Sequence, residues 1–158
     1  LTPNAGYRVA PITLDGYHHL TELRAIIEPQ AAALAAARAN ATDIAELRAL
    51  ATLAFDPNDD QGFAAYCRAN ARFHLRVVRT AGNPMLEHIV MSALDMSQRP
   101  AYLRIGRQLD PSNPSAKHHA IVDAIAAHDA ALAQQLMEKH VRGSGDRIFE
   151  ALTAAGYK

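Results

Sequence analysis

Histidine is the residue type with the most chemical potential in this sequence, since eight histidines occur among 158 residues. Neutral imidazole is the commonest metal ligand in proteins. Asn70 and His74 lie four residues apart, so on a helix they project from one face, a turn apart. His118 and His140 follow in two later segments. Helical bundles build metal sites from such an i, i+4 pair and imidazoles of other helices, and the set therefore indicates a metal site.

The spacing by itself also fits a simpler explanation, in which these are ordinary surface or core histidines. The chain carries other histidines for which no site is suspected, namely His18, His19, His88, His119 and His128. For a metal site, imidazole nitrogen suits zinc, nickel, copper or iron. We expect a divalent transition metal, with zinc first and nickel or manganese as alternatives. One coordination position would stay open to a ligand.

The composition indicates a single helical domain. The length is that of one domain, and the abundant Ala, Leu, Arg, Glu and Gln favour helix. The formal net charge is zero and no basic run is present, so these residues alone are not expected to bind DNA. Cys67 is the single cysteine, which excludes an internal disulfide. Without a long apolar span or a signal peptide, we expect no membrane partner and a cytoplasmic location.

Hydrophobic periodicity and chain breakers divide the sequence into six helices with short joins. The predicted helices are 15–39, 42 or 43 to before 57, about 60–80, 84 to about 106, about 115–127 and about 129–153. Residues 1–13 are irregular and are expected to be a linker. No strand or repeat is indicated, so the predicted fold class is all-α, a helical bundle.

Local signals refine several of these helices. Pro29 lies inside the first helix and should kink or divide it. Asp43 with Glu46 resembles a capping box at the start of the second helix. Gly82 should end the third helix, and Asn83 and Asp129 should cap the fourth and sixth helices. The apolar face predicted for the first helix consists of Leu20, Leu23, Ile26, Ile27, Ala31, Leu34 and Ala35.

Three segments of the chain together resemble one known family. They are "LTELRAIIEPQAAALAA", "NARFHLRVVRTAGNPML" and "HHAIVDAIAAHDAALAQQLMEKHV", in that order along the sequence. They are similar to the FCD ligand-binding domain, the C-terminal domain of FadR-subfamily regulators in the GntR superfamily. The resemblance covers about residues 14–153 and implies an antiparallel helical bundle around a metal. It implies that 14–158 form the FCD effector-binding and dimerisation domain. Residues 1–13, with "GYRVAP", look like the end of a winged-helix DNA-binding domain.

The family's metal ligands are an acidic residue, the histidine four positions later and two histidines from the closing helices. By position these correspond to Asn70, His74, His118 and His140, so the sequence departs from the pattern in having Asn70 instead of Asp. An amide oxygen can bind a metal but carries no charge. We therefore expect weaker metal binding and a stronger preference for an anionic ligand. Alternatively, Asn70 is no ligand and the site is partly occupied or empty.

The resemblance also implies a small organic acid as effector. Arg24 matches an arginine of the family that often faces the pocket, and its fork suits a carboxylate. The alternative is a surface pair of Arg24 with Glu28, worth about 0.3–0.5 kcal/mol. His119 is a second candidate effector contact, with an exposed helix start as the alternative.

The leading hypothesis is thus the sensor domain of a transcription regulator, a homodimer that reaches DNA only through an absent N-terminal domain. It is not expected to be an enzyme. A small helical metalloenzyme is the first alternative, but no acidic residue has an obvious place beside the three histidines to act as general base. The second alternative is a metal-free dimerisation module.

Overall fold

The polypeptide folds into helices throughout the part that the computed structural model describes, residues 13–52, 60–99 and 114–158. These helices are α1 (Leu14–Arg38), α2 (Ala41–Ala51), α3 (Asp60–Thr80), α4 (Pro84–Ser97), α6 (Pro114–Ala126) and α7 (Ala130–Ala154). No strand occurs in those ranges, and the all-α prediction is confirmed. The predicted linker and the "GYRVAP" segment fall outside them, apart from Thr13, which caps α1.

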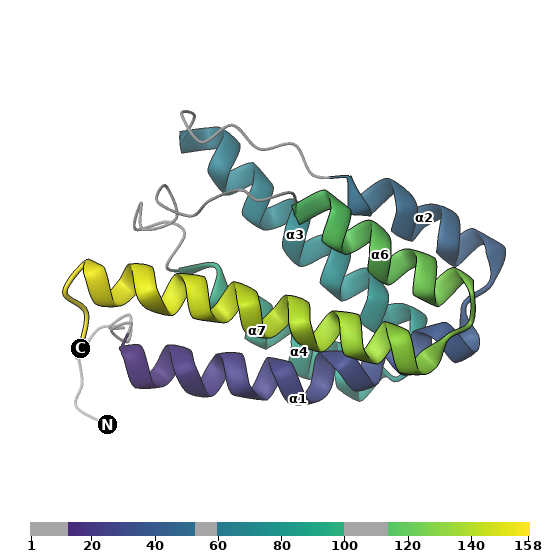
Figure 1. Ribbon diagram of the computed structural model, residues 1–158, viewed down its shortest axis with the longest axis horizontal. Coiled ribbons are helices and arrows are strands. Elements are labelled where there is room, and N and C mark those ends of the chain that lie inside the picture. Colours follow the sequence, from purple (N-terminus) through teal and green to yellow (C-terminus); the bar gives the residue numbers. More distant parts are fainter. Residues whose placement is uncertain (1–12, 53–59, 100–113) are drawn as a thin grey trace, which may run out of the picture.

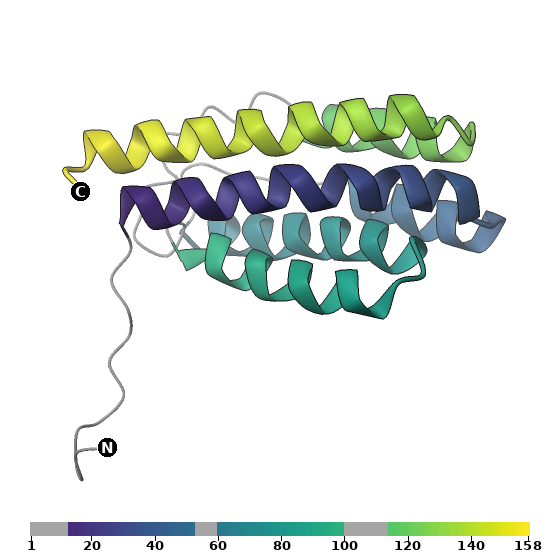
Figure 2. The ribbon, with the colours of Figure 1, turned by 90° about the horizontal axis from the view of Figure 1, so that it is seen from below.

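Consecutive helices run in opposite directions, as an antiparallel bundle requires (Figure 1). The two longest helices, α1 and α7, lie side by side, and the Leu14 amide donates a hydrogen bond of 3.2 Å to the Lys158 carbonyl. Helix α1 lies between α7 and α4 (Figure 2). None of the described helices is both long and apolar enough to cross a membrane.

Side chains and backbone at the helix ends explain where these helices begin. Asn40 and Asp43 form a reciprocal capping box at the start of α2. The predicted start at Thr42 or Asp43 was therefore late, because Asp43 is the inner partner of the box and Asn40 is the cap. Asn83 and Asp129 accept hydrogen bonds from the first turns of α4 and α7, as expected from the sequence.

The start of α4 at Pro84 agrees with the prediction, but its end does not. Gly82 precedes the helix with φ of +67°, which suits a residue without a Cβ. Helix α4 ends at Ser97, earlier than the predicted end near 106. A signal that the prediction neglected is Pro100, whose nitrogen has no hydrogen to donate to a carbonyl one turn back.

Helix α1 differs from its prediction in two respects. Of the two effects predicted for Pro29, division of the helix is absent, since one helix runs from Leu14 to Arg38. Its buried face also contains fewer large side chains than expected, because Leu23 and Ile26 are 40% and 59% exposed. Apart from Tyr17 near the start of the helix, the buried positions are taken by small residues and one acid: Ala25, Glu28, Pro29, Ala31, Ala32, Ala35 and Ala36. These small residues allow α7 to pack closely along α1.

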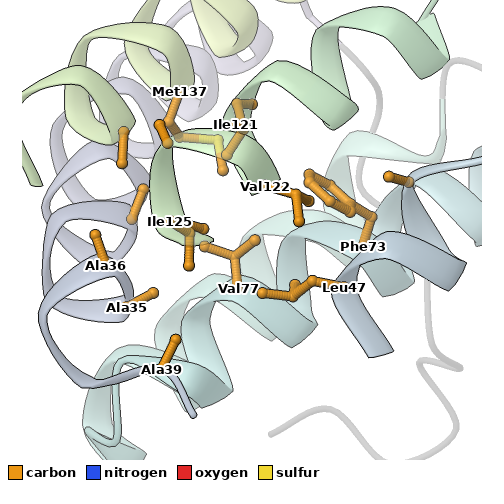
Figure 3. Close-up of a cluster of buried hydrophobic side chains, with 14 of the residues drawn as sticks. Ala35, Ala36, Ala39, Leu47, Phe73, Val77, Ile121, Val122, Ile125 and Met137 are labelled. Carbon is orange, nitrogen blue, oxygen red and sulfur yellow. The ribbon is translucent and has the colours of Figure 1, made fainter. Parts of the chain in front are cut away.

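The main core fills the space between α1, α2, α3, α6 and α7 (Figure 3). Large side chains from α2, α3, α6 and α7 meet the alanine surface of α1. The largest of them are Leu47, Phe73, Ile121, Ile125 and Met137, all fully buried. Each of the four helices that carry them therefore has a buried face near the centre of the bundle. Polar residues on such a face must find hydrogen-bond partners there.

The close contact of α1 with α7 leads to a test of the packing. Gly145 is buried, and a Cβ at this position would overlap the Thr21 side chain. The Cβ would meet the Thr21 Cγ2 and Oγ1 atoms and would also lie 3.1 Å from the Thr21 Cβ atom, so turning the Thr21 side chain would not remove the crowding. We expect Gly145→Ala to lower the free energy of unfolding by about 1–3 kcal/mol, measured by urea denaturation.

Gly143, in the same helix, is the matched control. A Cβ there meets only the Arg147 Nη1 atom at 3.7 Å, which is ordinary contact. Gly143→Ala should be neutral or stabilise by up to about 1 kcal/mol, because alanine is the better helix former. Equal destabilisation by the two substitutions would contradict the packing argument.

Candidate metal centre

Three histidines lie on the buried faces of three different helices. His74 precedes Val77 and Val78 on the inner face of α3. His118 and His140 occupy inner positions of α6 and α7, next to the core residues of those helices. Because each histidine shares a helical face with core residues, folding of the bundle brings all three inside.

The three imidazole rings converge on one point. The Nε2 atom of His140 lies 3.1 Å from Nε2 of His74 and 3.2 Å from Nε2 of His118. One nitrogen of each ring lies within 4.8 Å of those of the other two. The structure thus joins residues that are 44 and 22 positions apart in the sequence, as the spacing analysis anticipated.

Burial determines the protonation of two of the rings. Desolvation, and secondarily the neighbouring histidines, lowers the pKa of His118 and of His140 well below the ordinary value for histidine. Both rings are therefore neutral at pH 7, and each has a nitrogen lone pair. Their Nδ1 atoms are buried without a hydrogen-bond partner among the described residues.

The donor set fits a divalent cation. Zinc binds imidazole nitrogen at about 2.0–2.1 Å, so two ligands of a tetrahedral ion are about 3.3 Å apart. The Nε2–Nε2 separations of 3.1 and 3.2 Å are close to that value. If Nε2 of His140 carried the ring hydrogen, that single N–H could donate to only one of the other two Nε2 atoms. A cation placed between three Nε2 lone pairs would interact with all of them.

An acidic residue lies beside this cluster, contrary to the expectation from the sequence. The Glu28 carboxylate accepts at Oε2 from the Nδ1 atom of His74 at 2.5 Å, and at Oε1 from the Nε atom of Arg24 at 2.5 Å. Arg24 also donates a hydrogen bond from Nη1 to the Ser97 hydroxyl, at 3.3 Å. A chain of polar contacts thus leads from α4 through α1 to the histidines.

The same contacts keep Glu28 ionised. Burial alone would raise the pKa of this carboxyl, but the Arg24 guanidinium and His74 outweigh burial and hold the pKa at about 2. The pair of Arg24 and Glu28 does form, as the alternative prediction had it. It is not a surface pair, since the two side chains are only 11% and 1% exposed.

A sequence signal for Glu28 existed in principle. Glu28 lies three residues after Ala25 and four before Ala32, so it occupies the buried face of α1. An acid on such a face must be paired. The pairing with Arg24 was visible from the i, i+4 spacing, but the pairing with His74 joins residues 46 positions apart.

The remaining predicted site residues lie around the cluster. Asn70 is half-buried on α3, one turn before His74. His119 is half-buried, and its Nε2 atom lies 3.3 Å from the Thr52 hydroxyl at the end of α2. Phe73 was expected only as a core residue, but its ring also stacks on His118 with centroids 3.9 Å apart, which holds that imidazole in place.

Comparison with known proteins gives consistent matches. Residues 19–143, well over half of the chain, match the family model described as "FCD domain". A similar curated protein is the galactonate operon transcriptional repressor of Escherichia coli (strain K12), 28% identical over 133 residues. That alignment covers 83% of this chain and 57% of the relative, so the chain spans little more than half of the relative's length.

Solved structures share the fold. The E. coli protein McbR/YncC superposes with a TM-score of 0.78 at 15% identity, over 95% of this chain and 72% of that one. A transcriptional regulator (GntR family member) from Pseudomonas syringae pv. tomato str. DC3000 has a TM-score of 0.75 at 17% identity. There the match covers 98% of this chain and 64% of the other.

Proposed function

This chain belongs to the FCD domain family, and from this premise we propose that it is the effector-sensing domain of a bacterial transcription regulator. The observation that supports the proposal most is the buried convergence of three imidazole nitrogens. In the proposal, His74, His118 and His140 hold a divalent transition metal, zinc first, and Asn70 adds an amide oxygen. When bound, the metal supplies a Lewis-acidic position that attracts an anionic oxygen of the effector.

The effector in this proposal is a small carboxylate. Three neutral imidazoles and a neutral amide leave the charge of a divalent cation uncompensated, which favours an anion. The relative's name refers to galactonate, a sugar acid, so hydroxylated carboxylates are the first class to test. Arg24 and His119 are the proposed protein contacts to the acid. Arg24 uses Nε and Nη1 within the protein, and Nη2, which has no hydrogen bond among the described residues, is its proposed donor toward a ligand.

Calorimetry on metal-loaded and chelator-treated protein tests this function. The titrants are sugar acids, small dicarboxylates and, as a control, the matching uncharged sugar alcohols. We expect an acid to bind the metal-loaded protein at least about tenfold more tightly than the chelated protein, without being consumed. Binding that is insensitive to chelation would contradict the metal-anchored mechanism. Turnover of the acid would favour the metalloenzyme.

The metalloenzyme alternative has little support from the site. Glu28 is the described carboxylate in contact with the histidine cluster, and its two oxygens already accept from Arg24 and His74. A general base needs a free oxygen within reach of the substrate. We therefore propose a non-enzymatic role, as for the regulators to which the chain is similar.

Asn70 offers a direct test of the ligand set. Asn70→Asp would restore a charged oxygen one turn before His74, and we expect it to raise zinc affinity by about tenfold or more. The affinity is measured by competition with a chromophoric chelator. The matched control is Asn83→Asp, the same substitution at a helix cap on the surface. An unchanged zinc affinity in Asn70→Asp would mean that position 70 is not a ligand.

We also propose that the domain forms a homodimer through α1 and α4. Six of the eight large apolar side chains that are exposed in the described structure lie on these two adjacent helices. They are Leu23, Ile26, Met85, Ile89, Met91 and Met96. DNA would be reached through a winged-helix segment preceding these residues, and a regulator of this kind would act in the cytoplasm.

Light scattering tests the dimer. The wild type should have twice the mass of the 17.1 kDa chain, and Ile26→Glu should weaken association by about tenfold or more. Leu132→Glu is the control, because Leu132 is similarly exposed but lies on α7, across α1 from α4 (Figure 2). Equal weakening of association by the two variants would contradict an interface formed by α1 and α4.

A further inference from the structure

Glu28 is a buried carboxylate shared by two partners. Its side chain is 1% exposed, and each of its oxygens has one short contact, Oε1 with Arg24 and Oε2 with the Nδ1 atom of His74. An ionised carboxylate is only an acceptor, so the proton in the contact with His74 must reside on Nδ1 of the imidazole. The identity of residue 28 therefore decides which nitrogen of His74 carries hydrogen.

The other nitrogen of the same ring faces the cluster. Nε2 of His74 lies 3.1 Å from Nε2 of His140. With the ring hydrogen on Nδ1, the lone pair of His74 is on Nε2, at the point where the three rings meet. In metal sites, a histidine ligand typically donates its second N–H to a carboxylate or carbonyl, which fixes its tautomer and makes it a better ligand.

We propose that Glu28 is the positioning residue of this centre, which holds His74 as the Nδ1–H tautomer and presents Nε2 to the metal. Among the three histidines this support is specific to His74, because Nδ1 of His118 and Nδ1 of His140 have no hydrogen-bond partner in the described structure. His118 is held instead by stacking on Phe73. The inference rests on the proposed metal centre, and it assigns a role to a residue outside the expected ligand set.

Glu28→Gln tests this role with a small change of shape. A glutamine has one acceptor oxygen for the two donors that Glu28 serves, so it cannot satisfy both Arg24 and His74. Glu138→Gln is the matched control, because Glu138 also pairs with an arginine at i, i+4 and lies two residues from His140. That pair is about half exposed and does not contact the cluster.

Two readouts are compared in the nitrogen-15-labelled chain of 158 residues. Long-range proton–nitrogen NMR spectra report which nitrogen of His74 is protonated, with and without zinc, and chelator competition reports zinc affinity. We expect Nδ1 of His74 to be protonated in the wild type in both states. In Glu28→Gln the proton should be redistributed toward Nε2, and zinc affinity should fall by about 10–100-fold. Glu138→Gln should change neither readout.

The outcomes separate this inference from the proposed function. Retention of the Nδ1 proton in Glu28→Gln, or a wild-type proton on Nε2 without zinc, overturns the positioning role. So does zinc binding that is unchanged in the variant. A wild type that binds no zinc overturns the metal centre, while the zinc-free spectra still decide whether Glu28 sets the tautomer. Should Glu28→Gln fail to fold, the Arg24→Met/Glu28→Leu variant carries the same comparison, because it leaves neither a buried unpaired guanidinium nor an acceptor for the Nδ1–H group of His74.

Discussion

Replacing His74 with alanine is expected to reduce bound zinc from about one ion per chain to less than about a tenth, measured by elemental analysis of dialysed protein. His74 contributes the nitrogen that lies 3.1 Å from His140, and its loss leaves two imidazoles that rarely hold zinc alone. His118→Ala should have the same effect, because its nitrogen lies at a similar distance from His140.

The control for this loss is His19→Ala, which removes an exposed imidazole of α1. It should leave the zinc content unchanged. Thermal unfolding gives an independent measure, since a ligand at a hundred times its Kd stabilises the folded state by about 2.7 kcal/mol. A chelator should therefore lower the Tm of the wild type and of His19→Ala, but not that of His74→Ala. Zinc retained by His74→Ala would show that the histidine cluster is not the binding site.

Glu28→Leu is expected to lower the free energy of unfolding by about 3–5 kcal/mol, measured by urea denaturation of zinc-free protein. The Arg24 guanidinium is 11% exposed, so without Glu28 it remains buried as an unpaired charge. The Nδ1–H group of His74 would lose its acceptor in the same variant. Few single substitutions in this chain should cost as much.

Two further variants separate the causes of that loss. Glu138→Leu removes the acid of an exposed i, i+4 pair and should change stability by less than about 0.5 kcal/mol. Arg24→Met/Glu28→Leu exchanges the buried pair for apolar side chains, and should recover about half of the loss or more. No recovery in the double variant would show that the contact with His74, and not the ion pair, is the main contribution of Glu28.

The sequence alone determined the helices and most of their ends. Apolar periodicity and capping residues are local properties, which is why Asn83 and Asp129 were identified as caps. The three histidines were grouped as a set from their spacing together with the family resemblance, since the spacing by itself also fits ordinary surface or core histidines. Periodicity shows which face of a helix is buried, and buried faces meet in the centre of a bundle.

Only the tertiary structure decided what each face meets. Leu23 and Ile26 have the same apolar character as core residues, yet they are exposed because the inner side of α1 is occupied by alanines packed against α7. The contact of Glu28 with His74 depends on how α1 and α3 are placed relative to each other. Placement of two helices is a property of their combined packing, so no local pattern could have paired this acid with a histidine 46 residues away.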